Sequence, residues 1–295
     1  MTSKLTIVIP AFNESASLPK VIPDLLTTCE TEDWQIIIIN DGSTDDTKNI
    51  LLQWEESPRI KIIHHKVNRG YGGAIKSGIE NTLTKFCITY DADGQHHIES
   101  VKYLLQYMEK SNADLIVGGR TQKYSSGKLR ETGKWIIRKL AKILLPLNIN
   151  DLNSGMKIYQ TDLAKKYLPL CPNSMAYSDI ITLIFISQKH LVLEKPIQVN
   201  ERIAGESTIG VSTAMQTVIE IINILMLFNP LKIFIPTAIL FFAITTLWQI
   251  PIFLKGNGLS VGALLGYVFS FVIFLLGLIA EQLGLIRKLI LHRNG

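Results

Sequence analysis

Short runs rich in β-branched residues alternate with helical patterns along the first 120 residues of the chain. One run contains four consecutive isoleucines, at positions 36–39, which is typical of a strand covered by helices on both faces. The alternation predicts a Rossmann-like α/β fold, in which a mostly parallel sheet is flanked by helices. The predicted strands are Leu5–Ile9, Gln35–Ile39, Ile60–His64, Phe86–Tyr90 and Asp114–Val117, and the predicted helices are about Ala16–Cys29, Asp45–Glu56, Gly72–Leu83 and Ile98–Lys110.

The pattern is less regular between residues 121 and 230. Residues 121–150 contain a polar loop that leads into a basic amphipathic helix, predicted at Lys134–Leu145. Two strand-like pieces follow, at Gly155–Tyr159 and Leu193–Arg202. Ser212–Phe228 has an apolar face wide enough to lie in a membrane interface, and the Asn-Pro pair that follows ends this predicted helix.

Apolar positions become continuous near the C-terminus. Ile233–Leu254 and Leu259–Ala280 each hold 22 residues without an acidic or basic side chain, whereas about 20 apolar residues suffice to span a bilayer. A polar turn, 255–258, separates them, and a mean hydropathy of +0.24 is high for a soluble enzyme. We therefore expect a transmembrane helical hairpin rather than two buried core helices. The predicted divisions are a globular domain at 1–210, an interfacial helix at 211–230 and the hairpin with a short basic tail at 231–295.

The charged residues that flank the two runs predict how the hairpin is oriented. Arg287, Lys288 and Arg293 follow the second run, Lys232 precedes the first, and the turn holds only Lys255. The positive-inside rule then places the globular domain and both termini in the cytosol of an integral membrane protein with two spans. We expect a bacterial cell membrane. The net charge of +5 fits binding to anionic headgroups and phosphates. The sequence contains no basic run interleaved with aromatic residues, so we do not expect nucleic-acid binding.

Polar or glycine-rich clusters directly follow the first four predicted strands. Parallel strands bring their carboxyl ends to one edge of a sheet, and ligands of open α/β sheets bind there. The position of the clusters therefore predicts a ligand site at this edge. The clusters are Pro10-Ala11-Phe12-Asn13-Glu14, Asn40-Asp41-Gly42-Ser43-Thr44-Asp45, Asn68-Arg69-Gly70-Tyr71-Gly72-Gly73 and Asp91-Ala92-Asp93-Gly94-Gln95.

The last of these clusters contains the strongest chemical signal. Asp91 and Asp93 are carboxylates one residue apart, and such a pair can bind one hard cation, Mg²⁺ or Mn²⁺, that bridges to a diphosphate. Gln95 can add a neutral oxygen. An Asp-x-Asp sequence is often only a solvated turn, and its position after the fourth strand is what favours the metal site.

The remaining clusters allow two interpretations each. Asp41 can accept hydrogen bonds from a nucleobase or ribose, but its neighbours also suit the start of a helix. The segment 68–73 offers backbone N–H groups and Arg69 to a phosphate at a helix start, or it is a simple turn. The histidine pairs at 64–65 and 96–97 lack metal-ligand partners at convincing spacing and are interpreted as ordinary polar residues.

Taken in order, these motifs resemble the GT-A-fold glycosyltransferases of family 2. Asp151-Leu152-Asn153-Ser154-Gly155-Met156-Lys157 and Asn200-Glu201-Arg202-Ile203-Ala204-Gly205-Glu206-Ser207 resemble the dolichol-phosphate mannosyltransferase branch. That branch includes bacterial polyprenyl-phosphate glycosyltransferases with a C-terminal two-span hairpin. The resemblance covers nearly the whole chain. It departs at Thr208, where relatives often have a lysine.

The resemblance implies roles for individual residues. Asp91, Asp93 and Arg202 would be catalytic, and Asp91, Asp93 and Gln95 would bind Mg²⁺ or Mn²⁺. The implied nucleotide-sugar residues are Pro10, Phe12, Glu14, Ile39, Asp41, Ala92 and Arg120, and the cations expected near the acceptor phosphate are Arg202, Arg130, Lys134 and Arg138.

The function predicted from this resemblance is inverting transfer of a sugar from GDP-mannose or a UDP-hexose to dolichyl or undecaprenyl phosphate. A lipid monophosphate has its second pKa near 6, so it reaches the site largely as a dianion and needs no general base. The alternative enzyme is a non-processive family 2 transferase that acts on a saccharide or another lipid, with Asp179 as its base. A non-enzymatic membrane partner derived from a transferase is the other alternative. Expected partners are the nucleotide-sugar, the polyprenyl phosphate, the bilayer and a second copy of the chain.

Overall fold

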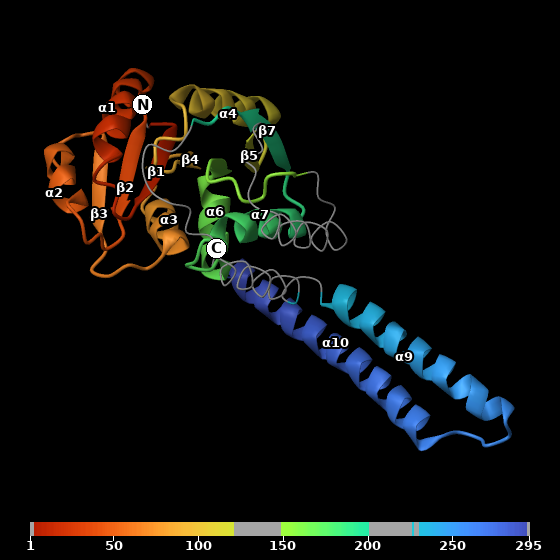
Figure 1. The fold of residues 1–295 in the computed structure, drawn as a ribbon. Helices are drawn as coiled ribbons and strands as arrows, with labels where there is room; N and C mark the ends of the chain where they lie inside the picture. The colour runs from red at the N-terminus through yellow and green to blue at the C-terminus, as the bar shows by residue number, and fades with distance from the viewer. Residues whose placement is uncertain (1–2, 121–148, 201–225, 227–229, 294–295) are drawn as a thin grey trace. The chain divides into compact units, whose positions relative to one another are not determined.

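The computed structural model describes residues 3–120, 149–200, 226 and 230–293 (Figure 1). The chain divides into two compact units, Met1–Glu220 and Ile221–Gly295. The basic helix predicted at Lys134–Leu145 lies outside the described residues, as does nearly all of the interfacial helix predicted at Ser212–Phe228.

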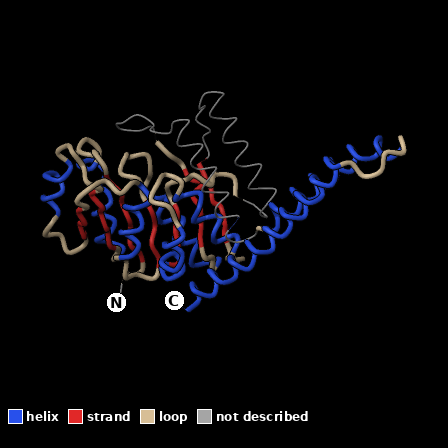
Figure 2. The backbone as a smooth tube through the Cα atoms, turned by 90° about the horizontal axis from the view of Figure 1, so that it is seen from below, coloured by secondary structure: helices blue, strands red, loops and turns tan. Residues whose placement is uncertain are grey.

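The first unit is built on one sheet whose strands lie side by side in the order β3-β2-β1-β4-β6-β5-β7 (Figure 2). β6 is antiparallel to both of its neighbours, and the other paired strands are parallel. The prediction of a mostly parallel sheet is confirmed. The strands are β1 (Leu5–Ala11), β2 (Gln35–Asn40), β3 (Ile60–His64), β4 (Phe86–Thr89), β5 (Leu115–Arg120), β6 (Lys157–Gln160) and β7 (Val192–Ile197).

Helices cover both faces of this sheet. Successive side chains of a strand point to opposite faces. Ile7 of β1 accordingly shares a buried core with Ile22 of α1 (Leu18–Glu32) and Leu104 of α4 (Ile98–Ser111). Val8 faces the other way, where α3 (Tyr71–Glu80) packs so closely that a Cβ at Gly78 would lie 2.3 Å from Val8 Cγ1. α6 (Thr161–Tyr167) and α7 (Tyr177–Ser187) contact α3.

Several predicted elements begin or end a few residues from their observed bounds, and two of these differences in the first unit have a clear physical reason. The helix expected at Asp45–Glu56 is split into α2 (Thr47–Leu51) and a 3-10 turn, η1 (Leu52–Trp54). It begins late because the Asp45 carboxylate accepts the backbone N–H groups of Ser15 and Thr47 and so lies outside the helix. The strand expected to reach Arg202 ends at Ile197, because Val199 then pairs with His96 instead of continuing along β5. A second 3-10 turn, η2, spans Leu168–Leu170.

The second unit is a pair of long helices, α9 (Leu231–Leu254) and α10 (Val261–Arg293). Leu231–Leu254 and Val261–Ile286 are long and apolar enough to cross a membrane, and most of their large apolar side chains are exposed. α10 begins two residues later than the predicted Leu259, since the Ser260 hydroxyl accepts the Ala263 N–H and Ser260 precedes the helix. It also continues past the predicted end at Ala280, because no proline interrupts the sequence that follows.

Candidate active site

The topology gathers the predicted site residues at one edge of the sheet. β1 to β5 are mutually parallel in direction, so the segments that follow them all leave from that edge. β6 runs the other way, and the segment 151–156 therefore enters the sheet at the same edge. This antiparallel strand brings Gly155 beside Asp91, after β4, and Asp151 beside Arg120, at the end of β5, a neighbourhood that the sequence did not predict.

Asp91 is enclosed by three residues from different segments. The hydroxyl of Tyr71, at the start of α3, donates a 2.9 Å hydrogen bond to Asp91 Oδ1. His96 Nε2 lies 3.4 Å from Asp91 Oδ2. On the remaining side, a Cβ at Gly155 would stand only 2.0 Å from Oδ2, so glycine is required there. His96 and Tyr71 were not among the predicted site residues.

The surroundings of Asp91 favour its ionised form. Burial by itself would raise the pKa of this carboxyl group, but the His96 and Tyr71 contacts and the charge of Arg120 hold the pKa below its usual value. Asp93 is 5% exposed, and its Oδ1 accepts the Gln95 N–H at 3.1 Å. Hydrogen bonds to neighbouring residues thus hold both acidic side chains of this loop.

The donor set of this loop suits a hard divalent cation. Among the residues that the structure describes, no three His, Cys, Asp or Glu side chains form a group that could hold a metal ion. Mg²⁺ in nucleotide sites is commonly held by one or two carboxylates, with the remaining ligands supplied by phosphate and water. Asp91 and Asp93 fit that pattern. Gln95 Nε2 donates to the Asn200 carbonyl at 3.3 Å, so Oε1 is the atom that a cation would use.

Asp41, after β2, accepts hydrogen bonds from other residues of the protein. Its side chain is 4% exposed and accepts the N–H of Arg69 and of Gly70, each at 2.9 Å. His65 Nδ1 lies 2.6 Å from Asp41 Oδ1. Two of the histidines interpreted as ordinary polar residues thus contact predicted site carboxylates: His65 contacts Asp41 from another segment, and His96 contacts Asp91 within the same loop.

The glycine-rich segment that begins α3 does not offer an open phosphate site. The Gly73 N–H donates to the Asn173 carbonyl at 3.2 Å, and a Cβ at Gly72 would lie 2.4 Å from the Pro172 carbonyl oxygen. A Cβ at Gly70 would likewise lie 2.5 Å from the Asn173 carbonyl oxygen. The glycines allow close approach of another segment of the chain. Protein carbonyls thus lie against the helix start, which favours the turn over the phosphate site as the interpretation of 68–73.

Arg120 ends β5 in a two-pronged contact with Asp151. Its Nε and Nη2 donate to Asp151 Oδ2 and Oδ1 at 2.8 and 2.9 Å. These hydrogen bonds raise the pKa of Arg120. Burial by itself would raise the pKa of Asp151, but the contact with Arg120 outweighs burial, so the pKa of Asp151 lies below its usual value. The guanidinium is therefore held in a fixed orientation.

Lys157, the first residue of β6, is fully buried. Its Nζ donates to the carbonyls of Leu152, at 2.7 Å, and of Ser178. Burial lowers the pKa of Lys157 to about 8. The lysine ties the segment before β6 to the start of α7, where Asp179 is also buried.

The other predicted residues are placed as follows. Pro10 and Ile39 lie within β1 and β2, and Ala92 is buried. Phe12 is 44% exposed, and Glu14 Oε2 accepts the Ser17 hydroxyl at 2.5 Å. Arg130, Lys134, Arg138, Arg202 and Thr208 lie outside the described residues.

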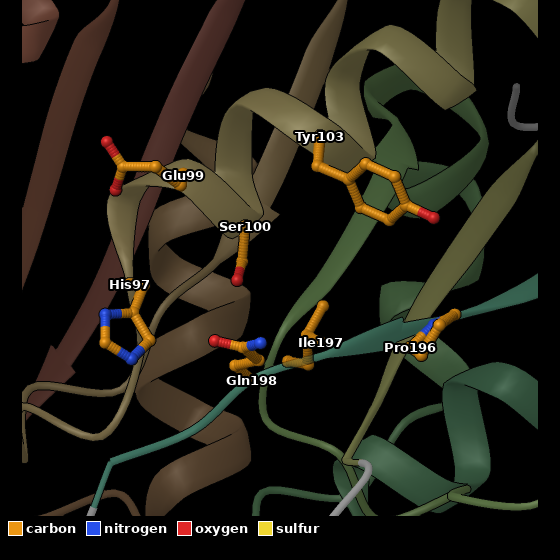
Figure 3. A pocket seen from close by; sticks show the side chains of 7 residues that line it. All are labelled: His97, Glu99, Ser100, Tyr103, Pro196, Ile197 and Gln198. Carbon is orange, nitrogen blue, oxygen red and sulfur yellow. The ribbon is translucent and has the colours of Figure 1, made fainter.

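A shallow pocket of about 370 Å³ lies close by, between the start of α4 and the end of β7 (Figure 3). His97 and Glu99 line one side, and Ile197 and Gln198 the other. A second pocket, of about 280 Å³, is lined by Lys20 and Asp24 of α1 together with residues 94 and 96–99. Neither is lined by Asp91 or Asp93, although the second is lined by Tyr90, Gly94 and His96, which flank these acids in the chain.

Comparison with known proteins decides the family. The model of Glycosyl transferase family 2 matches residues 6–168. The chain belongs to this family. A second model, the GtrB C-terminal hairpin, matches residues 229–286, which include α9 and most of α10. The resemblance seen in the motifs is thereby confirmed for both parts of this family 2 enzyme.

Two curated relatives carry related names. A dolichyl-phosphate beta-glucosyltransferase of Dictyostelium discoideum is 26% identical over 240 residues, which cover 75% of this chain and 73% of the relative. A second one, from Trichomonas vaginalis, is 32% identical over 130 residues, or 40% of each chain.

Solved structures agree on the fold. Glucosyl-3-phosphoglycerate synthase from Mycobacterium tuberculosis, in complex with Mn²⁺, UDP and phosphoglyceric acid, superimposes with a TM-score of 0.60 at 16% identity. The match covers 75% of this chain and 78% of the synthase. The same synthase with Mg²⁺ and UDP gives a TM-score of 0.59 at 16% identity, over 75% of this chain and 79% of the synthase. The GT-A architecture predicted from the sequence is confirmed.

Proposed function

We propose that this family 2 glycosyltransferase transfers a hexose from a nucleotide-sugar to a polyprenyl phosphate, with inversion at the anomeric carbon. The observation that supports it most is the union of a family 2 domain and a GtrB C-terminal hairpin in one chain. The transferase domain alone would suit a soluble acceptor. Two apolar helices suit an acceptor whose long hydrocarbon tail stays in a membrane.

The transferred sugar is proposed to be glucose. Both relatives described above are named dolichyl-phosphate beta-glucosyltransferases. UDP-glucose is the first donor to test, because structural neighbours of the same fold were crystallised with UDP. GDP-mannose and other UDP-hexoses are the competing donors. Pro10, Phe12, Glu14, Ile39, Asp41 and Ala92 are the proposed nucleotide-sugar residues, all of which belong to β1, β2 or the segments that follow β1, β2 and β4.

The chemical step joins two anions, and the proposed roles of the side chains follow from that difficulty. An oxygen of the lipid phosphate forms a bond to the anomeric carbon, and the bond from that carbon to the diphosphate breaks, with its electron pair leaving on the diphosphate. Arg120 is already oriented by Asp151, so it can meet a phosphate without losing further side-chain freedom. Arg120 belongs with the proposed nucleotide-sugar residues, and Arg202, Arg130, Lys134 and Arg138 are proposed as the cations for the acceptor phosphate.

Asp91, Asp93 and Gln95 are proposed to hold Mg²⁺ or Mn²⁺, which would neutralise charge on the departing diphosphate. Asp91 supports this role because its environment keeps the carboxyl group ionised. Tyr71 and His96 fix the orientation of the Asp91 side chain. No side chain needs to act as a base toward a phosphate dianion.

The decisive experiment uses the full chain purified in detergent with undecaprenyl phosphate or dolichyl phosphate. Each of UDP-glucose, GDP-mannose and UDP-N-acetylglucosamine is supplied in turn, and release of nucleoside diphosphate and formation of the lipid-linked sugar are measured. We expect nucleoside diphosphate to be released with one of these donors, and only when lipid phosphate is present. Addition of EDTA should abolish this release. Release only with a saccharide acceptor would favour the alternative transferase, and no release with any acceptor would overturn the enzymatic proposal.

The proposed topology places the transferase domain and both termini in the cytosol and the turn between α9 and α10 outside. The three native cysteines are buried, so a new cysteine in the turn would give a specific signal. We expect Asn257→Cys to react with a membrane-impermeant maleimide in intact cells, whereas Asn49→Cys in α2 should react only after lysis. The reverse pattern would overturn this orientation.

A further inference from the structure

His65 connects the proposed nucleotide-binding edge to α3. It directly follows β3, and its side chain is 4% exposed. Its two ring nitrogens have different partners: Nδ1 lies 2.6 Å from Asp41 Oδ1, and Nε2 lies 2.9 Å from the hydroxyl of Ser77. The imidazole is therefore a bridge between a carboxylate at the site edge and a helix behind it.

The chemistry of the partners assigns the proton on the ring. A carboxylate only accepts hydrogen bonds, so Nδ1 carries the proton that Asp41 receives. Nε2 then accepts from the Ser77 hydroxyl when the ring is neutral. A neutral His65 satisfies both contacts.

The bridge also completes the set of donors around Asp41. The N–H groups of Arg69 and Gly70 donate to Oδ1 and Oδ2, and His65 adds a second donor to Oδ1. A carboxylate offers about four acceptor positions, so one of them, on Oδ2, is left by these three contacts. The N–H groups of Arg69 and Gly70 hold one oxygen each, and His65 is the one side-chain donor among the three, so it adds a further restraint on the rotation of the carboxylate and hence on the direction of that position.

We propose that His65 is a positioning residue that aims the Asp41 carboxylate at a donor group of the nucleotide. This inference rests on the proposed function, in which Asp41 contacts the nucleotide-sugar. His65 itself touches no substrate. It acts through Asp41, and its loss should weaken nucleotide binding while the chemical step on bound donor proceeds.

Two substitutions separate positioning from simple filling of the core. Asparagine at 65 can place its amide N–H near the position of Nδ1 and keep the Asp41 contact, whereas glutamine reaches the position of Nε2 and keeps the Ser77 contact. Both variants are polar, uncharged and smaller than or similar to histidine. A purely structural role predicts similar losses for the two. A positioning role predicts that His65→Gln binds the nucleotide more weakly, whereas His65→Asn keeps nearly the affinity of wild type.

The measurements are the dissociation constants of UDP and GDP by calorimetry in the presence of Mg²⁺, and the KM and kcat of the transfer reaction, on the full chain in detergent. For the nucleotide that binds, we expect His65→Gln to weaken binding and raise the donor KM about tenfold, the usual effect of losing a hydrogen bond to a buried charge. His65→Asn should stay within about threefold of wild type, and kcat and the KM for lipid phosphate should change little in both. His64→Asn, which alters the exposed neighbouring histidine, is the control.

The outcomes distinguish the two proposals. Equal dissociation constants for the Asn and Gln variants would overturn the role of His65, even if transfer is active. A wild-type protein that binds nucleotide without transferring sugar would overturn the proposed function, while the two dissociation constants still decide the role of His65. Binding of neither nucleotide would overturn both. Should His65→Gln fail to fold, His65→Leu takes its place, with thermal unfolding as the check on folding. A tenfold weakening of nucleotide binding in His65→Leu would support the role of His65, and unchanged binding would overturn it.

Discussion

Gly155 lies so close to Asp91 that a Cβ on Gly155 would stand 2.0 Å from the carboxylate oxygen Oδ2. Two segments that lie far apart in the sequence thus meet in close contact. Ser154, the preceding residue, is buried and donates to the Gly118 carbonyl at 2.5 Å, so the segment cannot easily move away. The position of the proposed metal-binding carboxylate is therefore set partly by a glycine on another strand connection.

Replacement of this glycine tests the relationship. We expect Gly155→Ala to displace the Asp91 carboxylate and to reduce kcat by roughly a hundredfold or more, the effect typical of a misplaced catalytic group. The apparent affinity for Mn²⁺, followed by electron paramagnetic resonance, should fall in parallel. Gly262→Ala, where an added Cβ meets no atom within 4 Å, is the matched control. A Gly155→Ala enzyme with wild-type kcat and Mn²⁺ affinity would show that the contact has no functional consequence.

Removal of the Asp93 carboxylate should reduce transfer more than Gly155→Ala does. Asp93→Ala takes away one of two acidic ligands, and we expect transfer to fall by roughly a thousandfold at every Mg²⁺ concentration, because charge on the departing diphosphate is no longer neutralised. The protein should remain folded, as judged by its thermal unfolding. Asp24→Ala removes an exposed acid from α1 and should leave transfer unchanged. Normal turnover in Asp93→Ala would refute the metal assignment.

The position of these acids could be predicted from sequence, whereas their surroundings could not. A buried run followed by Asp91-Ala92-Asp93 indicates a strand end, and parallel sheets collect their ligands there. Apart from His96 in the same loop, the partners of Asp91 come from α3 and from the segment before β6, and no local pattern reveals which distant segments meet. β6 itself is short, and its antiparallel insertion between β4 and β5 depends on pairing across the sheet.

The glycine-rich segment shows a different limit. Residues 70, 72 and 73 signal close approach of something to the backbone, and that part of the prediction was sound. A phosphate and a neighbouring carbonyl require the same absence of Cβ atoms. The sequence therefore could not separate a binding loop from a packing contact, and the structure assigns these glycines to contact with residues 172–174.

The buried ammonium of Lys157 makes stability depend on pH. Burial lowers its pKa from 10.5 to about 8 in the folded protein. Between these values the unfolded chain binds more protons than the folded one, so the free energy of unfolding should rise as pH increases through this window. The gain is at most about 3 kcal/mol. We expect it as an upward trend in the unfolding free energy of wild type relative to Lys157→Met from pH 8 to pH 10. Parallel pH profiles of the two proteins would contradict a buried, charged lysine.

The hairpin turn contains the last interaction to test. Gln249 is 7% exposed near the end of α9, and its Nε2 donates to the Gly258 carbonyl at 2.7 Å. Its Oε1 accepts the N–H and the hydroxyl of Ser260, at 3.1 and 2.9 Å. A single amide thus ties the end of one helix to the residue that precedes the next.

Gln249→Leu keeps the approximate volume of the side chain but leaves these backbone groups without their partner. We expect the hairpin to lose about 1–2 kcal/mol of unfolding free energy, measured by thermal or denaturant unfolding in detergent. Asn257→Ala, an exposed substitution in the same turn, should change the unfolding free energy by less than about 0.5 kcal/mol. Because the transferase domain is a separate compact unit, its own unfolding transition should be unchanged in Gln249→Leu. Equal stability of Gln249→Leu and wild type would mean that the turn is held by its backbone conformation alone.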